Sequence, residues 1–111
     1  MDYPTVEQLI EEAPEVLSKS TLGNLKQVYN LAKYRAATCA IGKMADNLLF
    51  IGQGIDDMVD EMAYAFQKGR IESSDYDAYI RKIESFQWGT VPAMVKDALP
   101  QKCGCKLVPP K

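Results

Sequence analysis

The chain has 111 residues, of which 47% are hydrophobic and 25% charged, and its formal net charge is −2. This composition is typical of one soluble globular domain with a single core and excludes a wholly disordered chain. The chain has no histidine, which removes the commonest general base and the commonest imidazole metal ligand. Its longest apolar run, "NLLFIGQGI", is too short to span a membrane, and its first residues lack a secretory signal.

The first predicted element is a helix over "PTVEQLIEEA", residues 4–13. Thr5 is its expected N-cap, and Gln8 three residues later completes a capping box. The apolar residues Val6, Leu9, Ile10 and Ala13 follow the spacing of one helix face. Pro14 cannot continue this helix without losing a backbone hydrogen bond, so it either ends the helix or starts another short turn that carries Val16 and Leu17.

A second, longer helix is predicted from a cap at Ser20 or Thr21 to about Ile51, with a kink or break near Gly42. At about 100° per residue, Lys26 and Lys33 lie opposite its apolar face. Arg35 falls on the apolar side, which predicts an ion partner, a snorkelling stem or a subunit contact. The apolar face consists of Leu25, Val28, Leu31, Ala32, Ala36 and Cys39.

The glycines of "GQG" at 52–54 are expected to end that helix, and a third helix then covers 55–67. Its inward stripe is Ile55, Met58, Val59, Met62 and Phe66.

A fourth helix is predicted over "ESSDYDAYIRKIESF", residues 72–86, with a capping box at Ser74 and Asp77. After "QWG", Thr90 is expected to cap a short last helix that ends at Pro100. The expected inner residues of these two helices are Tyr76, Tyr79 or Ile80, Ile83, Phe86, Val91, Met94, Val95 and Ala98. No segment has a convincing strand period.

The fold prediction is therefore an all-α, compact bundle of four to five helices with one long central helix. The helical bundle domain is expected to cover residues 1–100. Residues 101–111, "QKCGCKLVPPK", form a flexible, irregular tail in this interpretation, because glycine and two prolines interrupt any helix.

Charge is segregated along the chain. Residues 1–18 carry only acidic side chains, residues 19–43 only basic ones, and residues 46–61 again only acidic ones. Alternating blocks of opposite sign suit charge-steered docking of helices, within one chain or between chains.

The run Asp56-Asp57-Met58-Val59-Asp60 resembles the aspartate-rich DDxxD helix of prenyl and terpene synthases, which bind magnesium and a diphosphate. Those enzymes have a much larger bundle and a second carboxylate cluster. The amphipathic partition of residues 55–67, with carboxylates in the first turn after Gly54, explains the run without a ligand. We interpret it as an acidic face turned to solvent or to a protein.

A second pattern resembles the small all-α nucleotide pyrophosphohydrolases of the MazG type, which place an EExxE segment and a later ExxD segment around magnesium. Here Glu11, Glu12 and Glu15 would supply the first segment, and Asp57 and Asp60 the second. Pro14 lies inside the first segment, the second begins with Asp, and the spacing between them is too long. A magnesium-dependent hydrolase is therefore an alternative, and our prediction is a non-enzyme with no cofactor and no metal.

Three cysteines, an odd number, predict a mostly reduced, cytoplasmic protein. Cys39 lies among alanines and is interpreted as a packing residue. Cys103 and Cys105 are interpreted as exposed thiols in the tail, although Gly104 between them would permit a local disulfide or a shared metal.

The predicted function is that of a non-catalytic interaction or assembly protein that docks a protein partner or a second copy of itself. The candidate partner-binding residues are Lys26, Lys33, Arg35, Asp56, Asp57, Asp60, Glu61 and Trp88. Trp88 is either an interface anchor or a plug at the bundle end. The alternative is nucleic-acid binding through Lys19, Lys26, Lys33, Arg35 and Lys43, since clustered cations suffice for phosphate contacts.

Overall fold

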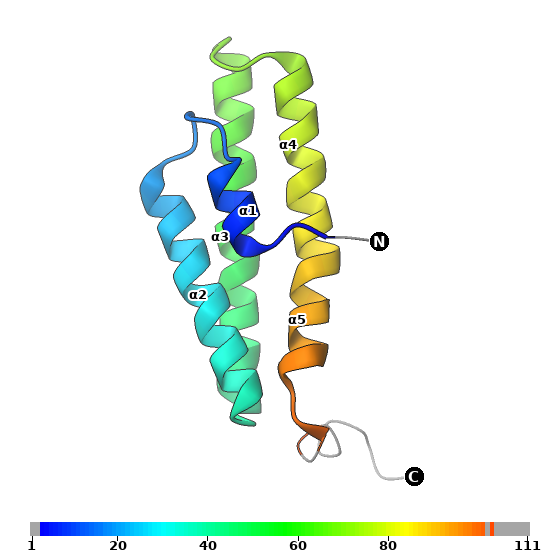
Figure 1. Cartoon of the computed structure of the whole chain (residues 1–111). Coiled ribbons are helices and arrows are strands. Elements are labelled where there is room, and N and C mark those ends of the chain that lie inside the picture. Colours follow the sequence, from blue (N-terminus) through cyan, green and yellow to red (C-terminus); the bar gives the residue numbers. More distant parts are fainter. Residues whose placement is uncertain (1–2, 102, 104–111) are drawn as a thin grey trace.

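The computed structural model describes residues 3–101 and 103, and this part of the chain is an all-α bundle (Figure 1). Helices α2 and α3 run antiparallel to each other, and α4 continues through η1 into α5 as one rod beside α3. The short α1 lies in front of α3 in this view, between α2 and α4 (Figure 1). The elements are α1 (Val6–Glu11), α2 (Lys19–Ala37), α3 (Ile41–Gln67), α4 (Ser73–Ser85), the π-helical segment η1 (Phe86–Thr90) and α5 (Val91–Ala98).

The predicted capping box of α1 is confirmed. The Thr5 hydroxyl accepts a hydrogen bond from the Gln8 backbone N–H at 3.0 Å, and the Gln8 side chain accepts one from the Thr5 N–H at 2.9 Å. Helix α2 begins earlier than predicted, because Ser18 and not Ser20 or Thr21 is its N-cap. Ser18 accepts a hydrogen bond from the Thr21 N–H at 3.1 Å.

The predicted break near Gly42 is present, but it lies a few residues earlier. Helix α2 stops at Ala37, since Cys39 adopts a left-handed conformation with φ of 62°. The predicted helix end at Ile51 is wrong. Helix α3 then runs unbroken through Gly52 and Gly54. Gly54 faces Leu25 of α2, so the buried apolar stripe continues past the glycines and outweighs their low helix propensity.

The rod formed by α4, η1 and α5 also differs from the prediction of two separate helices. Helix α4 begins at Ser73 with no side-chain cap, so the capping box at Ser74 and Asp77 is wrong. Thr90 does not cap α5. Its hydroxyl instead donates to the Pro4 carbonyl at 2.5 Å and holds the N-terminal segment against the rod.

The core follows the predicted apolar faces closely. Leu9, Leu25, Met58 and Met62 are fully buried, whereas Leu31 and Phe66 are exceptions, with 38% and 43% exposure. The buried core cluster consists of Val6, Leu9, Leu17, Leu22, Leu25, Tyr29, Ala32, Ile51, Ile55, Met58, Met62, Tyr79, Ile83, Phe86 and Met94. Phe66 is partly exposed and stacks on Tyr76 with ring centroids 4.7 Å apart.

Among the described helices, none combines the length and the apolar composition needed to cross a membrane. Of the predicted tail 101–111, the structure describes only Gln101 and Cys103, and the expected irregular conformation of the other tail residues lies outside the described part.

Candidate functional site

The three aspartates of the DDxxD-like run project from the middle of α3 into solvent. Asp56, Asp57 and Asp60 are all exposed, and so is Asp46 three turns earlier. Because α3 begins at Ile41, Asp56 and Asp57 are far from its first turn, and the expected helix-dipole stabilisation at that position is wrong. Within the described residues, none of these four carboxylates takes part in an ion pair.

Exposed apolar side chains lie on the same helix. Leu49 is 69% exposed and Phe50 is 55% exposed. They lie about one helical turn from Asp46 and about two turns from Asp56 and Asp57. We name the set Asp46, Leu49, Phe50, Asp56, Asp57 and Asp60 the acidic face of α3. Sequence reasoning missed Leu49 and Phe50, because it placed both inside an apolar run at a helix end.

Glu61 differs from its acidic neighbours. Its carboxylate accepts hydrogen bonds from the Ser18 backbone N–H at 2.9 Å, from the Thr21 hydroxyl at 2.5 Å and from the Ser18 hydroxyl at 3.4 Å. A carboxylate at the start of α2 also interacts favourably with the positive end of the helix dipole. This predicted partner-binding residue is therefore engaged with its own chain and joins α3 to α2.

The basic residues do not form one surface. Lys19, Lys26 and Lys33 are exposed on α2 and repeat every seven residues, and we name them the basic face of α2. Lys43 is exposed on α3. Arg35 is half-buried and donates to the side-chain oxygen of buried Asn47 at 2.8 Å. Its partner in this chain is therefore a neutral amide and not an ion, which was one of the three predicted alternatives.

The basic residues of segment 19–43 and the acidic residues of segment 46–61 form no ion pairs with each other in the described part of the chain. Across residues 3–101 and 103, the single ion pair joins Lys82 of α4 to Glu12, the C-cap residue of α1. The exposed charges of α2 and α3 thus remain turned to solvent in this chain.

Trp88 lies in η1 and is 74% exposed. The prediction that it plugs the end of the bundle is wrong, because its ring lies mostly outside the core. Its role as an interface anchor stays a prediction. Gly89 beside it is buried under the ring of Tyr3.

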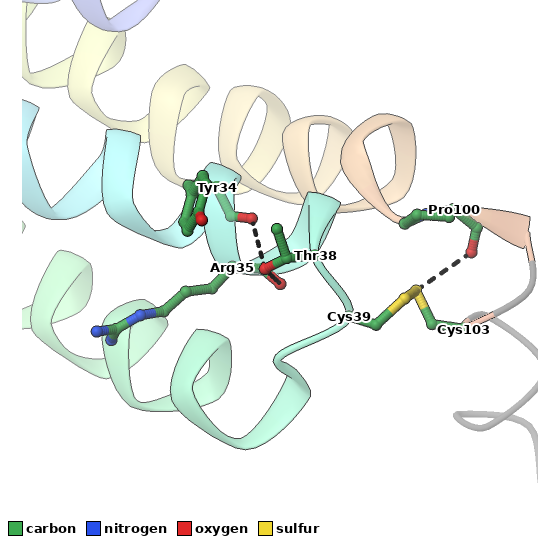
Figure 2. The surroundings of a disulfide bond; sticks show 6 residues. All are labelled: Tyr34, Arg35, Thr38, Cys39, Pro100 and Cys103. Atoms are coloured by element: carbon green, nitrogen blue, oxygen red, sulfur yellow. Dashed lines mark hydrogen bonds between the residues drawn. A yellow bond between two sulfur atoms is a disulfide. The ribbon is translucent and has the colours of Figure 1, made fainter.

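Cys39 and Cys103 form a disulfide with their Cα atoms 5.6 Å apart (Figure 2). The bridge joins the corner between α2 and α3 to the residues after α5. Cys103 is buried, with 1% exposure, and Cys39 is half-buried. The prediction of a packing thiol at Cys39 and an exposed thiol at Cys103 is therefore wrong. Cys105 lies outside the described residues.

Among the described residues, no group of three or more acidic or cysteine side chains is placed to hold a metal ion. Glu15, Asp60 and Glu61 line one open cavity of about 660 Å³ together with Arg70. Glu12 pairs with Lys82, and Glu11 and Asp57 do not line this cavity. The magnesium-dependent hydrolase stays an untested alternative prediction.

Two tyrosines have altered acidity. Burial raises the pKa of Tyr79 well above its ordinary value of 10.0, and its hydroxyl donates to the Leu9 carbonyl at 2.5 Å. Burial, and then the nearby negative charge of Glu7, raise the pKa of Tyr29. Both phenols therefore stay protonated at neutral pH and are poor candidates for catalytic bases.

Comparison of the chain with protein-family models, with curated protein sequences and with solved structures finds no match.

Proposed function

We propose that the chain is a non-catalytic interaction protein whose acidic face of α3 docks a basic helix, in a second copy of the chain or in another protein. The observation that carries this proposal is the combination of four exposed carboxylates without ion pairs and the exposed Leu49 and Phe50. Apolar side chains supply contact area, while the surrounding charges steer association and select the partner.

The like charges on this face favour a cationic occupant. Asp56 and Asp60 are four residues apart on α3, and such pairs destabilise an isolated helix by about 0.2–0.5 kcal/mol. A lysine-bearing helix placed against them relieves this repulsion. The basic face of α2, Lys19, Lys26 and Lys33, supplies such a helix in every copy of the chain.

Light scattering of the purified protein tests self-docking. The screening length of exposed charges is about 30 Å at a salt concentration of about 0.01 M and about 3 Å at about 1 M. We expect an oligomer at the low salt concentration that dissociates at the high one. Trp88, the single tryptophan of the chain, provides a fluorescence signal if the contact extends to η1.

Two variants distinguish docking through the acidic face of α3 from a general effect of net charge on association. Replacing Asp56, Asp57 and Asp60 by Asn should abolish the low-salt oligomer. The matched control replaces the exposed Asp77 and Glu84 of α4 by Asn and Gln and should leave it intact. A monomer at both salt concentrations, together with no binding of a lysine-rich amphipathic peptide, would contradict the proposal.

Nucleic-acid binding is the alternative, and the exposure of Lys19, Lys26 and Lys33 along one helix supports it. Phosphate contacts weaken steeply with salt, so titration of labelled DNA and RNA at several salt concentrations tests this alternative. Replacement of the three lysines by Gln should remove any binding. The absence of salt-sensitive binding near physiological ionic strength would exclude it.

A further inference from the structure

We propose that the Cys39–Cys103 disulfide is a thiol–disulfide exchange site, and that small thiols or dithiols open it to release one end of the bundle without unfolding the core. The proposal does not depend on docking by the acidic face of α3. It rests on the backbone at Cys39, on the burial of the two cysteines and on the location of the bridge.

The backbone at Cys39 shows that the chain places sulfur where glycine is the favoured residue. Helix α2 ends with hydrogen bonds from the Cys39 N–H to the Ala36 carbonyl at 3.2 Å and from the Ala40 N–H to the Arg35 carbonyl at 2.8 Å. Such an ending requires a left-handed residue, and Cys39 has φ of 62°. Packing alone does not require cysteine there.

Helix α3 ends in the same way and provides a comparison within the chain. The Gly69 N–H donates to Phe66 at 3.1 Å, and the N–H of the next residue, Arg70, donates to Ala65 at 2.9 Å. Gly69 has φ of 69°. The chain thus uses glycine at one helix end and cysteine at the equivalent position of the other, where the sulfur forms the bridge.

The two cysteine residues differ in exposure. Cys39 is half-buried and Cys103 is buried, so an incoming thiolate reaches Cys39 more readily. Attack on Cys39 Sγ breaks the bridge, forms a mixed disulfide at Cys39 and leaves the electron pair on Cys103 Sγ. After protonation the Cys103 thiol can donate to the Pro100 carbonyl, whose oxygen lies 3.4 Å from the sulfur (Figure 2).

A second thiolate then attacks the mixed disulfide and releases the thiolate of Cys39. The two protein sulfurs are reduced, and the two external thiols leave as their own disulfide, so electrons and atoms balance.

The location of the bridge makes the opening local. Ala36, Met44 and Cys103 are buried but lie outside the main core cluster. Ala36 is in the last turn of α2 and Met44 in the first turn of α3, on either side of Cys39. The 64-residue separation of Cys39 and Cys103 means that the bridge holds distant parts of the chain together at this end. Its loss therefore frees this end first, while the core around Met58 stays packed.

Hydrogen exchange of the oxidised and reduced full chain tests the proposal. The test uses Cys105→Ser, which leaves Cys39 and Cys103 as the only thiols. Peptide mapping without reductant should recover the Cys39–Cys103 bridge, and millimolar reduced glutathione or dithiothreitol should open it in the native protein. On reduction, exchange in residues 36–44 should accelerate by about tenfold or more, corresponding to about 1.4 kcal/mol of local stability. Residues 55–62 should remain protected.

The double variant Cys39→Ser, Cys105→Ser is the matched control. It cannot form the bridge, so its exchange should equal that of the reduced protein and should not respond to reductant. Three results would overturn the proposal: no bridge in the oxidised protein, no change at residues 36–44 on reduction, or loss of protection in residues 36–44 and 55–62 together.

Discussion

The hydroxyl of Tyr79 on α4 donates a hydrogen bond to the backbone carbonyl of Leu9 on α1 at 2.5 Å, and both residues are buried. Leu9 lies in the last turn of α1, where carbonyl groups lack partners within the helix. Tyr79 therefore satisfies a buried acceptor and fixes the short α1 on the bundle.

Removing this hydroxyl should destabilise the protein. Tyr79→Phe keeps the ring but leaves the Leu9 carbonyl unsatisfied, which costs about 1–3 kcal/mol. Urea unfolding measures the loss. Tyr64→Phe, at a position with 54% exposure, is the control and should change stability by less than about 0.5 kcal/mol. Equal effects of the two variants would argue against the role of the hydrogen bond.

The raised pKa of Tyr79 predicts a loss of stability in alkali. The unfolded chain releases the phenolic proton near the ordinary pKa of 10.0, whereas the folded chain retains it to higher pH. Between these two pKa values the native state binds more protons, so the free energy of unfolding falls as pH rises above about 10. Urea unfolding from pH 8 to pH 11 should show a smaller decline for Tyr79→Phe. Burial also raises the pKa of Tyr29, which accounts for a remaining slope.

Gly89 in η1 lies so close to Tyr3 that a Cβ at this position would overlap the Tyr3 ring. Gly89→Ala should therefore cost about 1–3 kcal/mol, although alanine normally stabilises helical segments. Gly52→Ala is the control, since nothing lies within 4 Å of its expected Cβ, and it should add about 0.5–1 kcal/mol. Thermal melts compare the two. In the Gly89→Ala background, Tyr3→Ala should recover part of the loss.

The periodicity of apolar residues was sufficient to predict the all-α fold and most of the core. It was not sufficient for the helix boundaries. Gly52 and Gly54 indicated a helix end, but packing of the stripe from Ile51 to Met62 against α2 outweighs two weak helix formers. The break between α2 and α3 was expected near Gly42 but lies at Cys39, because the left-handed residue that ends α2 is a cysteine and not the usual glycine.

The site was less predictable than the fold, for two physical reasons. A disulfide pairing depends on which residues meet in space, and three cysteines leave every pairing open. The partner of Arg35 was likewise hidden, because Asn47 is a polar residue within an apolar run and becomes an acceptor only after α2 and α3 pair. Charge segregation identified Asp56, Asp57 and Asp60 as exposed but could not separate Glu61 from them.

Substitutions at positions 60 and 61 test whether Glu61 has a structural role that the exposed aspartates lack. Glu61→Ala removes the acceptor of the Ser18 N–H and the Thr21 hydroxyl and should cost about 1–3 kcal/mol. Glu61→Gln keeps an acceptor but loses the charge at the start of α2, and should cost about 0.3–1 kcal/mol. Asp60→Asn, one residue earlier and exposed, should be neutral or slightly stabilising because it removes repulsion from Asp56. Chemical unfolding at neutral pH measures the free energy of unfolding of all three variants. Equal losses of stability at positions 60 and 61 would contradict the structural role of Glu61.

Once the disulfide is absent, the protein with cysteine at position 39 should be less stable than the protein with glycine there. In a Cys103→Ala background, which removes the bridge, Cys39→Gly should be more stable than Cys39→Ala by about 1–2 kcal/mol, because only glycine adopts φ of 62° without a steric penalty. Gly69→Ala tests the same penalty at the end of α3, where φ is 69° and nothing lies within 4 Å of the new Cβ, so its loss should be similar. Urea unfolding under reducing conditions measures all three. A contrary result would be equal stability of the glycine and alanine variants at position 39, together with a destabilised Gly69→Ala. The left-handed conformation at the end of α2 would then depend on the disulfide itself. In that case the backbone at Cys39 would relax when the bridge opens.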